Sequence, residues 1–430
     1  MKAVALIDAN NFYVSCERAF NPRLRGEPTV VLSNNDGCVV SRSNEAKQIG
    51  IRMAVPIFQV RSIIERHGVH VLSSNYELYG DLSNRMMNVL EEFSPEVERY
   101  SIDEAFVSLE AEDSAGLEKL GREIKARVYR YTGVPVSVGI GATKMLAKVA
   151  GFHAKTLPQL ESVFDLTPAS LQVPALRRTP IEEVWGVGYR WATKLKANGI
   201  CTAFDLREAR DEWIRANMNV TGLRMAHELR GIPCHTLATI PQPRRAINST
   251  RSFGKMVDSL DDLKAAVGTF VTRAAEKLRR ERMLAGVITV FVLTDRHKLD
   301  DEQYSGSLTL QLAPMTNITT DIQTVAFKAL QTIYRKDLRY KKAGVMLGDL
   351  VPDYGLPQPL WETGKTEKMR ELMAKVDQLN RRYGRETVQC GTFISDGKWQ
   401  MQMNSRSPRY TTRWDELLKV NSESYTKREA

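Results

Sequence analysis

The chain has 430 residues, of which 43% are hydrophobic, and its 61 Lys and Arg exceed 51 Asp and Glu to give a formal net charge of +10. This length allows about two to four domains with packed cores, and the positive charge favours a polyanionic partner such as nucleic acid. The five cysteines form no C-x-x-C pair, which argues against a zinc ribbon or a disulfide framework. The N-terminal apolar run ends at Asp8 and is too short for a signal-peptide core, and no run is long enough for a membrane span, so we expect a cytoplasmic protein without a membrane partner.

Residues 1–165 alternate between strand and helix patterns, which predicts an α/β unit. The short apolar run "AVALI" at 3–7 is typical of a buried central strand. Asp8 follows this run and therefore lies at the carboxyl end of the strand, where open α/β sheets place their functional sites. Further strands are predicted at 29–33, 69–74, 96–109 and 135–141, and helices at 117–130 and about 143–155.

Residues 166–240 contain prolines and glycines between short helical patterns, so we expect a small helical domain. Within it, Gly186 and Gly188 form a Gly-x-Gly turn between two helices, and Lys194 and Lys196 follow. Such a turn exposes backbone N–H groups at a helix N-terminus, where a phosphate binds without contact to a base. The alternative is a helical hairpin with a purely structural role.

The remaining residues contain a second α/β pattern and a tail. After an exposed linker at 241–252, the order β-α-β-β-α-β predicts a split βαβ domain. Its strands are expected at 251–257, 286–294, 305–312 and 343–350, and its helices at 260–281 and 319–335. From 351 a Pro/Gly-rich tether leads to a helix whose apolar residues form an expected docking surface: Met369, Leu372, Met373, Val376, Leu379 and Tyr383.

Asp103 and Glu104 are adjacent carboxylates within the strand predicted at 96–109. Successive strand residues face opposite sides, so both reach one point only if the strand bends there. Two ionised carboxylates brought together without a cation would raise one pKa sharply. A divalent ion shared with Asp8 removes this objection, and all-oxygen ligation suits Mg²⁺. The alternative is an exposed turn, with Asp8 as a solvated strand end.

Two further groups of residues have both a functional and a structural interpretation. Phe12 and Tyr13 follow Asp8 at a predicted helix start, where backbone N–H groups can meet a polar ligand and a ring can pack on a sugar. They equally fit an ordinary core. A predicted helix over 41–53 carries three cations that either pair with phosphates or form a solvated face: Arg42, Lys47 and Arg52.

Several motifs are distributed over nearly the whole chain. They are "LIDANNFYVSCE", "VVLSNNDGCVVSRSNEAKQIGIRM", "SSNYELYGDLS", "YSIDEAF", "GIGATKMLAKVA", "SRSFG", "KAGVMLGDL" and "SPRYTTRWDELL". Together they resemble the Y-family of translesion DNA polymerases, in its UmuC branch, which supplies the catalytic subunit of DNA polymerase V. The resemblance implies an α/β multi-domain, right-hand polymerase: palm at 1–14 and 75–165, fingers at 15–74, helical thumb at 166–240, little finger at 241–350 and a partner-binding tail at 351–430.

The resemblance also implies roles for single residues. Asp8 and Asp103 would ligate two Mg²⁺ ions, with Glu104 completing the catalytic-ion site and the Ala9 carbonyl as a further ligand. Tyr13, beside Phe12, stands at the steric-gate position, where its ring would clash with a ribonucleotide 2′-OH. Three residues match positions around the incoming triphosphate: Lys47, Lys155 and Ser41. One departure is Asn44, which stands where many family members carry a phosphate-binding tyrosine.

By resemblance, the chain is an error-prone, DNA-directed DNA polymerase that performs translesion synthesis in the SOS response to DNA damage. It would add a dNMP from a dNTP to the primer 3′-OH of primer-template DNA. The duplex would be held through its phosphates by the helix-hairpin-helix residues Gly186, Gly188, Lys194 and Lys196. The expected protein partners are a UmuD-type accessory dimer, a RecA filament and a sliding clamp. The clamp would bind Leu360 and Trp361 of "LPQPLW", which lacks the usual Gln start.

Two other classes of function use some of the same features. A nucleotidyl cyclase or a nuclease would use the three carboxylates, but it would not need domains that hold a duplex. A catalytically silent DNA-binding relative would keep the basic domains and lose a carboxylate, whereas this chain retains Asp8, Asp103 and Glu104.

Overall fold

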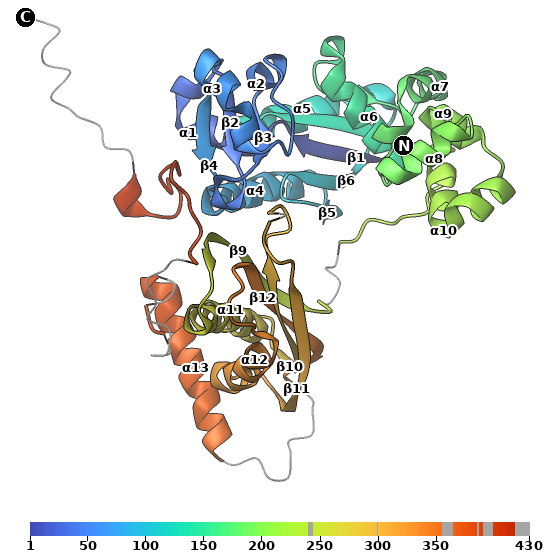
Figure 1. Ribbon diagram of the computed structural model, residues 1–430. Coiled ribbons are helices and arrows are strands. Elements are labelled where there is room, and N and C mark those ends of the chain that lie inside the picture. Colours follow the sequence, from blue (N-terminus) through green and yellow to red (C-terminus); the bar gives the residue numbers. More distant parts are fainter. Residues whose placement is uncertain (240–243, 299, 355–363, 385–386, 390–398, 418–430) are drawn as a thin grey trace, which may run out of the picture. The chain divides into compact units, whose positions relative to one another are not determined.

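The structure is a computed structural model that describes residues 1–239, 244–298, 300–354, 364–384, 387–389 and 399–417 (Figure 1). The chain divides into two compact units. The first contains Met1–Ser33, Gly37–Pro241 and Asn404–Ala430, and the second contains Asn34–Asp36 and Gln242–Met403. Among the described residues, we find no helix with the length and apolar character needed to cross a membrane.

The first unit contains a five-stranded sheet with the order β5-β6-β1-β7-β8. Its strands span Lys2–Ala9 (β1), Val97–Arg99 (β5), Glu104–Glu110 (β6), Val136–Gly141 (β7) and Val163–Asp165 (β8). The central position predicted for β1 is confirmed, because β1 pairs antiparallel with both β6 and β7. The register places Asp8 directly opposite Glu104, so these two carboxylates lie at the same end of the sheet.

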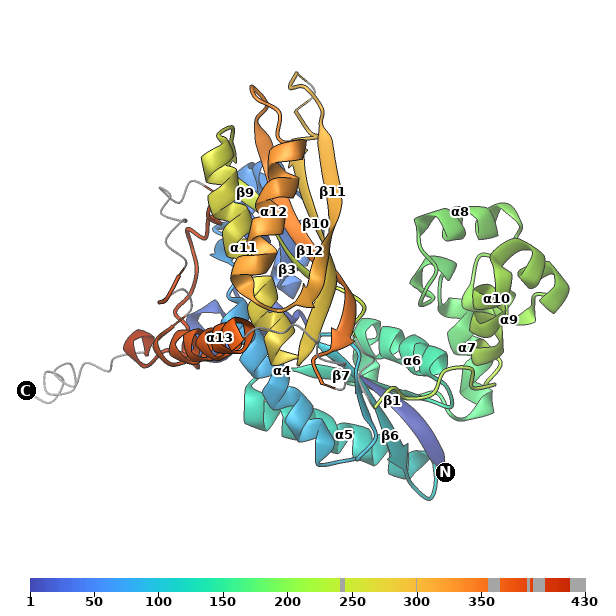
Figure 2. The same ribbon diagram turned by 90° about the horizontal axis from the view of Figure 1, so that it is seen from below.

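Helices cover both faces of this sheet (Figures 1 and 2). Ile7 belongs to the core shared with α4 (Tyr76–Glu91) and α5 (Ser114–Thr132), whereas Leu6 packs with α6 (Lys144–Thr156) on the other face. This division follows from strand alternation, because neighbouring residues of β1 point to opposite faces. It explains why the whole of "AVALI" is apolar.

Helix α6 approaches the sheet closely because glycines line the contact. A Cβ atom built on Gly139 of β7 would lie 2.1 Å from the backbone nitrogen of Gly151 in α6, which no side chain tolerates. The close packing brings the lysines of α6 towards the strand ends that carry the acidic residues.

A smaller three-stranded sheet, of order β3-β2-β4, follows the first helix of the chain. β2 pairs antiparallel with β3 and parallel with β4. Its elements and the neighbouring helices are α1 (Phe12–Phe20), β2 (Thr29–Leu32), β3 (Val39–Arg42), α2 (Asn44–Gln48), α3 (Arg61–His67) and β4 (His70–Ser73). Short 3₁₀ turns occur at Pro22–Leu24, Asn34–Asp36, Ile57–Val60, Pro158–Leu160, Ile181–Glu183 and Trp414–Glu416.

The segment predicted to be a small helical domain contains four helices: α7 (Ala169–Arg178), α8 (Tyr189–Ala197), α9 (Ala203–Glu208) and α10 (Asp211–Leu229). They share an apolar core that includes Leu176, Leu195, Leu206 and Ile214. Helix α9 begins with a capping box in which Thr202 and Asp205 satisfy each other's backbone N–H groups. The helical character expected of this segment is therefore confirmed.

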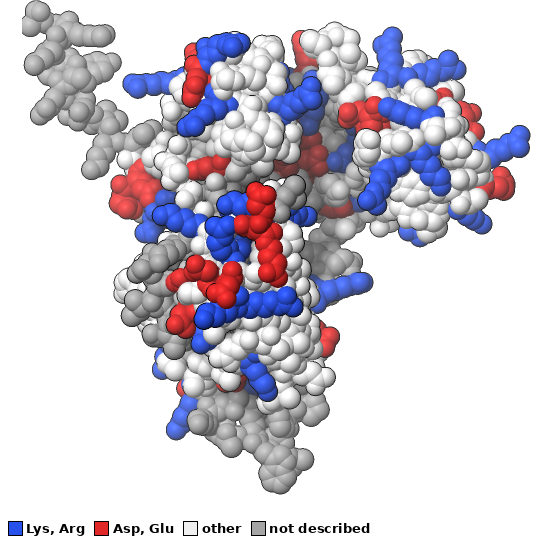
Figure 3. Space-filling view, in the orientation of Figure 1, with Lys and Arg blue, Asp and Glu red and all other residues white. Residues whose placement is uncertain are grey.

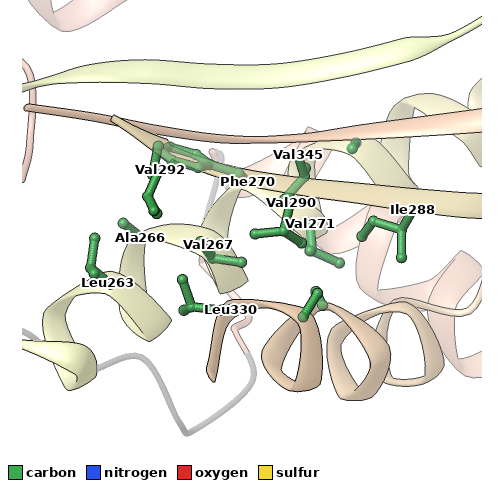
Figure 4. Packing of buried hydrophobic residues seen from close by; sticks show 14 of the residues in the cluster. Leu263, Ala266, Val267, Phe270, Val271, Ile288, Val290, Val292, Leu330 and Val345 are labelled. Carbon is green, nitrogen blue, oxygen red and sulfur yellow. The ribbon is translucent and has the colours of Figure 1, made fainter. Parts of the chain in front are cut away.

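The second unit has the predicted β-α-β-β-α-β order. Its elements are β9 (Ile247–Val257), α11 (Leu260–Arg280), β10 (Met283–Thr294), β11 (Ser305–Thr316), α12 (Thr319–Ile333) and β12 (Tyr340–Pro352). The four-stranded sheet has the order β11-β10-β12-β9 and is antiparallel throughout. Figure 4 shows Phe270 of α11, Val290 of β10 and Leu330 of α12 in the core between the sheet and the two helices. A further helix, α13, spans Gly364–Tyr383.

Three predictions of local structure are wrong. The stretch 96–109 is a hairpin of β5 and β6 rather than one strand, because the chain turns at 100–103. Strand β9 begins at Ile247, so half of the linker expected at 241–252 is paired backbone. The helix expected from 41 begins only at Asn44, since Arg42 belongs to β3.

Candidate active site

The turn between β5 and β6 determines how the adjacent carboxylates are placed. Asp103 is the last residue before β6, and its carbonyl oxygen accepts a hydrogen bond from Ala9 N–H at 2.9 Å. Glu104 begins β6 and faces Asp8 across the antiparallel pair. Strand alternation therefore does not separate Asp103 from Glu104, because only one of them lies in a strand.

Each carboxylate has a polar partner within the protein. Asp8 forms an ion pair with Lys155, and Glu104 accepts from Lys148 Nζ at 2.8 Å. Asp103 accepts from the Ser101 hydroxyl at 2.6 Å. Two lysines of α6 thus contact Asp8 and Glu104, one lysine to each carboxylate.

The Asp8 and Glu104 side chains are also hydrogen-bonded to each other. This bond shifts their pKa values in opposite directions. Burial raises the pKa of Asp8 to about 7, and the bond to Glu104 adds to this rise while Lys155 opposes it. Burial also acts to raise the pKa of Glu104, but the bonds from Asp8 and Lys148 outweigh it and hold this pKa below its ordinary value. Of the two carboxyl groups, Asp8 is therefore the one that binds a proton more readily.

The donor set suits a hard divalent cation. Asp8, Asp103, Glu104 and the Ala9 carbonyl offer only oxygen atoms, which Mg²⁺ prefers. A cation would also oppose the rise in the pKa of Asp8 that burial causes. Within the described residues, no three side chains of His, Cys, Asp or Glu are already gathered in a metal-binding arrangement.

A cavity of about 390 Å³ joins the acidic strand ends to the three-stranded sheet. It contains most of the residues expected at the site: Asp8, Ala9, Phe12, Tyr13, Ser41, Lys47, Asp103 and Lys155. Glu104 does not line it but reaches it through the hydrogen bond to Asp8. The lining of the cavity therefore combines carboxylates with cationic side chains.

The aromatic residues occupy the first turn of α1. Phe12 is buried, whereas the half-buried Tyr13 presents its ring to the cavity. The Tyr13 ring stacks on that of Tyr79 from α4, with centroids 4.5 Å apart and planes at 13°. Asn11 makes no side-chain capping bond to α1 and the first turn has no acidic residue, so this helix start favours an anion.

Three cationic side chains line the cavity: Lys47, Arg42 and Lys155. Burial and the charges of Arg42 and Lys155 lower the pKa of Lys47. Lys47 donates to Asn44 Oδ1 at 3.3 Å, and Asn11 Nδ2 donates to the same oxygen at 3.0 Å. Asn44 therefore orients Lys47 through this hydrogen bond. This role does not depend on a direct contact between Asn44 and a triphosphate.

Ser41 already has partners in the protein. Its hydroxyl donates to the Asn11 carbonyl at 3.3 Å and accepts from Val14 N–H at 3.4 Å. These bonds hold β3 against the first turn of α1. Ser41 is thus placed at the cavity wall, as expected, but it also fixes the geometry of that wall.

Lys148 is a residue of this site that the sequence analysis did not select. In addition to its bond with Glu104, its ammonium group lies 4.7 Å from the ring centroid of Tyr100 and 5.7 Å from that of Trp185. The Trp185 indole N–H donates to the Tyr100 hydroxyl at 3.0 Å. The available signal was helical spacing, since Lys148 and Lys155 are seven residues apart and share a helix face.

The helix-hairpin-helix residues lie in the helical segment, where Lys and Arg side chains project from α7–α10 (Figure 3). Gly186 has φ +91°, and a Cβ there would meet the Met225 side chain at 2.2 Å, so this turn requires glycine. Gly188 is the N-cap of α8. Lys194 donates to the Asn217 carbonyl at 2.9 Å and Lys196 pairs with Glu182 at 2.8 Å. Both ammonium groups are exposed, where such contacts are weak and exchange readily with a phosphate.

The expected docking elements of the tail have different outcomes. Leu360 and Trp361 lie outside the described residues. Helix α13 turns Met373, Asp377 and Asn380 inward, and its exposed apolar residues are Leu372, Leu379 and Tyr383. The apolar stripe predicted for this helix is therefore divided between a buried and an exposed face.

Comparison with known proteins agrees with this geometry. Residues 7–151 match the impB/mucB/samB family, residues 244–359 match the C-terminal domain of that family, and residues 370–420 match a domain of unknown function. The chain is 43% identical to protein UmuC of Salmonella typhimurium, with 97% of this chain and 99% of the relative covered. It is 42% identical to protein ImpB of Salmonella typhimurium, with 96% and 98% covered.

More distant relatives and solved structures extend the comparison. DNA polymerase IV of Desulfatibacillum aliphaticivorans is 29% identical, with 91% of this chain and 96% of the relative covered. A Y-family DNA polymerase chimera has the same fold, with a TM-score of 0.66, 19% identity, and 82% of this chain and 100% of that chain covered. An insertion ternary complex of Dbh DNA polymerase gives a TM-score of 0.53 at 20% identity and the same coverage. The chain therefore belongs to the impB/mucB/samB family, as a UmuC-type member of the Y-family DNA polymerases.

Proposed function

We propose that this chain is an error-prone DNA polymerase that transfers a dNMP from a dNTP to a primer 3′-OH during translesion synthesis. The observation that carries the proposal is the cavity whose lining brings carboxylates and cationic side chains together. A triphosphate needs cations along its length and a divalent ion at the reacting phosphate. The family to which the chain belongs supports the same activity.

The residues of the cavity have separate tasks in this proposal. Lys155, Lys47 and Arg42 bind oxygens of the triphosphate, which replaces Asp8 as the partner of Lys155. When held by Asp8, Asp103, Glu104 and the Ala9 carbonyl, two Mg²⁺ ions would stabilise charge on the attacking and leaving oxygens. Lys148 keeps Glu104 ionised and oriented, because it donates to that carboxylate from a position over aromatic rings.

Tyr13 acts as the steric gate in this proposal. Its ring lines the cavity beside the carboxylates and is backed by the Tyr79 ring. A ring fixed in this way would exclude a ribonucleotide by contact with its 2′-OH. Phe12 supports the start of α1 from within the core.

The helical segment and the second unit would hold primer-template DNA. Gly186 and Gly188 offer backbone N–H groups, and Lys194 and Lys196 offer charge, so binding would depend on phosphates rather than sequence. The domain names palm, fingers, thumb and little finger, with the boundaries predicted from the sequence, belong to this proposal. The proposal also places the chain in the SOS response, with a UmuD-type dimer, a RecA filament and a sliding clamp as its partners.

A primer-extension assay tests the proposal. Asp103→Ala should reduce dNTP incorporation by about 10²–10³-fold, because it removes a ligand of the reacting centre. Asp261→Ala is the matched control, since that carboxylate is 95% exposed on α11 in the second unit. If the wild-type chain extends no primer with Mg²⁺, an accessory dimer and RecA present, the polymerase proposal is wrong. If Asp103→Ala extends normally, the site assignment is wrong.

A further inference from the structure

Residues 404–417, which we call the C-terminal strap, pack on the first unit although they follow the second unit in sequence. Ser73 N–H donates to the Ser405 carbonyl, and Ser405 N–H donates to Ser73 Oγ, both at 3.0 Å. The Tyr410 ring stacks on Phe20 of α1, with centroids 5.1 Å apart and planes at 5°. The strap lies within the region that matches a domain of unknown function.

Asn75 connects the strap to the start of α4. Its Nδ2 donates to Ser407 Oγ at 2.9 Å and to the carbonyls of Ser407 and Pro408 at 3.2 and 3.1 Å. Its Oδ1 caps α4 by accepting from Leu78 N–H at 3.4 Å. Asn75 is buried, so these bonds are shielded from water. One amide thereby links the position of the strap to the first turn of α4.

A second link passes through a buried carboxylate on α1. Glu17 is 1% exposed, and its Oε1 accepts from the Tyr79 hydroxyl at 2.7 Å and from the Ser407 hydroxyl at 3.0 Å. Burial raises the pKa of Glu17, and both hydroxyl donors oppose that rise. A buried carboxylate is stable only while its hydrogen bonds are made. The strap therefore supplies one of the donors that keep Glu17 in place.

The same tyrosine that binds Glu17 supports the cavity wall. Tyr79 is fully buried, and its ring lies flat against that of Tyr13. Tyr76, from the same helix, meets the edge of the Tyr13 ring at a centroid distance of 6.0 Å. A continuous chain of contacts thus runs from Ser407 through Glu17 and Tyr79 to Tyr13.

We propose that the C-terminal strap is a positioning element of the nucleotide site. Ser407 orients Glu17, Glu17 anchors the Tyr79 hydroxyl, and the Tyr79 ring sets the tilt of Tyr13. This inference rests on the proposed role of Tyr13 as the steric gate. It assigns to the strap a part in the choice between deoxyribonucleotides and ribonucleotides, although the strap does not line the cavity.

A purely structural role for the strap predicts something different. In that case, loss of the Ser407 hydroxyl would lower the melting temperature and leave sugar selectivity unchanged. In the positioning role, the Tyr13 ring gains freedom when Glu17 or Tyr79 loses its partner. Selectivity then falls even in a variant whose stability is nearly normal.

The experiment compares kcat/KM for a dNTP with that for the matching rNTP in primer extension by the full-length chain. Ser407→Ala and Tyr79→Phe should each lower the dNTP/rNTP ratio by roughly tenfold, the size of one hydrogen bond to a charged group. Ser407→Thr, which keeps the hydroxyl, should restore the ratio. Ser405→Ala is the matched control, because the bonds of Ser405 to Ser73 use its backbone.

Tyr13→Ala separates failure of this inference from failure of the proposed function. If Tyr13→Ala leaves the ratio unchanged, the gate itself is misassigned. If Tyr13→Ala lowers the ratio and neither Ser407→Ala nor Tyr79→Phe differs from Ser405→Ala, the role of the strap is overturned.

A measurement without DNA or nucleotide tests the same chain of contacts. Amide hydrogen exchange of the full-length chain should become faster in α1 and in the first turn of α4 in Ser407→Ala, but not in Ser405→Ala. Faster exchange confined to residues 404–417 would contradict the inference, because the strap would then be loosened without effect on the helices that carry Tyr13 and Tyr79.

Discussion

Two buried carboxylate sites, one in each unit, differ in how their charge is satisfied. In the second unit, Asp377 of α13 forms a two-pronged pair with Arg279 of α11, with distances of 2.7 and 2.8 Å. Arg279 also donates to the Asn317 carbonyl at 2.6 Å. In the first unit, Asp8 has one lysine and a hydrogen bond with Glu104, and burial raises the pKa of Asp8 to about 7. The first pair is complete, whereas Asp8 has a single ammonium contact beside a second carboxyl group.

The comparison distinguishes a structural ion pair from a binding site. A guanidinium matches a carboxylate in two parallel hydrogen bonds and leaves nothing for a ligand. An ammonium group on a flexible side chain makes a single contact and can leave. The incomplete satisfaction of Asp8 is therefore the physical mark of a place where a cation belongs.

The largest effect is expected from breaking the complete pair. Arg279→Ala leaves Asp377 buried without a partner and should lower the free energy of unfolding by about 3–5 kcal/mol. Urea denaturation at pH 7 measures this loss. Arg280→Ala, at an exposed position in the same helix, should change stability by less than about 0.5 kcal/mol. Equal losses in the two variants would contradict the view that the Arg279 pair is structural.

Substitution of Asp8, whose pairing is incomplete, should raise the free energy of unfolding, whereas loss of Arg279 should lower it. The pKa of Asp8 is raised on folding, so its contribution to stability is present below its unfolded pKa near 3.8 and is lost as pH rises through about 7. Asp8→Asn should therefore stabilise the metal-free protein by roughly 2–4 kcal/mol above pH 7 and have little effect below pH 4.

Denaturation in EDTA across this pH range measures the difference. Asp377→Asn is the contrasting control, because it loses a complete pair and should destabilise the protein at pH 7. If the free energy of unfolding of Asp8→Asn and of the wild type depends on pH in the same way, the pKa of Asp8 is not raised on folding.

Removing the partner of Glu104 should have a smaller effect that depends on metal. Lys148→Met keeps the apolar stem against the Tyr100 ring but leaves Glu104 without its cation. Stability in EDTA should fall by about 1–3 kcal/mol. Excess Mg²⁺ should reduce that loss, because the ion then supplies the missing charge. The same loss with and without Mg²⁺ would mean that Glu104 does not meet the ion, and Lys148→Arg serves as the charge-preserving control.

The smallest effect is expected at the exposed pair of the helical hairpin. Lys196→Ala breaks a surface contact with Glu182, so stability should change by less than about 1 kcal/mol. Affinity for duplex DNA should weaken at every sequence, and the slope of log affinity against log salt should decrease by about 1. Lys119→Ala, at an exposed position of α5, is the matched control. An unchanged slope in Lys196→Ala would remove this residue from the DNA surface.

The sequence predicted those parts of the fold whose cause is local. The apolar run before Asp8 indicated a central strand, and periodicity gave the whole β-α-β-β-α-β order of the second unit. The turn before Glu104 was missed because the residues on both sides of it follow a strand-like alternation, so the whole stretch resembled one strand. Helix α4 was missed because its buried tyrosine and methionines are spaced among polar residues, although Asn75 marks its cap.

The site could be predicted only as far as its residues lie in recognisable segments. The residues of the cavity come from four such segments, and their convergence is an outcome of packing. Lys148 could be assigned to the site only from the structure, which shows the face of α6 that meets β6. The bond from Ser407 to Glu17 joins residues 390 positions apart, and no local pattern encodes such a contact.

The most direct test of the account is whether nucleotide binding depends on a divalent ion held by Asp8. Calorimetry should measure dATP binding to the full-length chain in Mg²⁺ and in EDTA, for the wild type, Asp8→Asn and the exposed control Asp261→Ala. We expect Mg²⁺ to strengthen binding by at least about tenfold in the wild type and the control, and to have little effect in Asp8→Asn. Equal affinity in Mg²⁺ and EDTA, or a full Mg²⁺ effect in Asp8→Asn, would contradict the account.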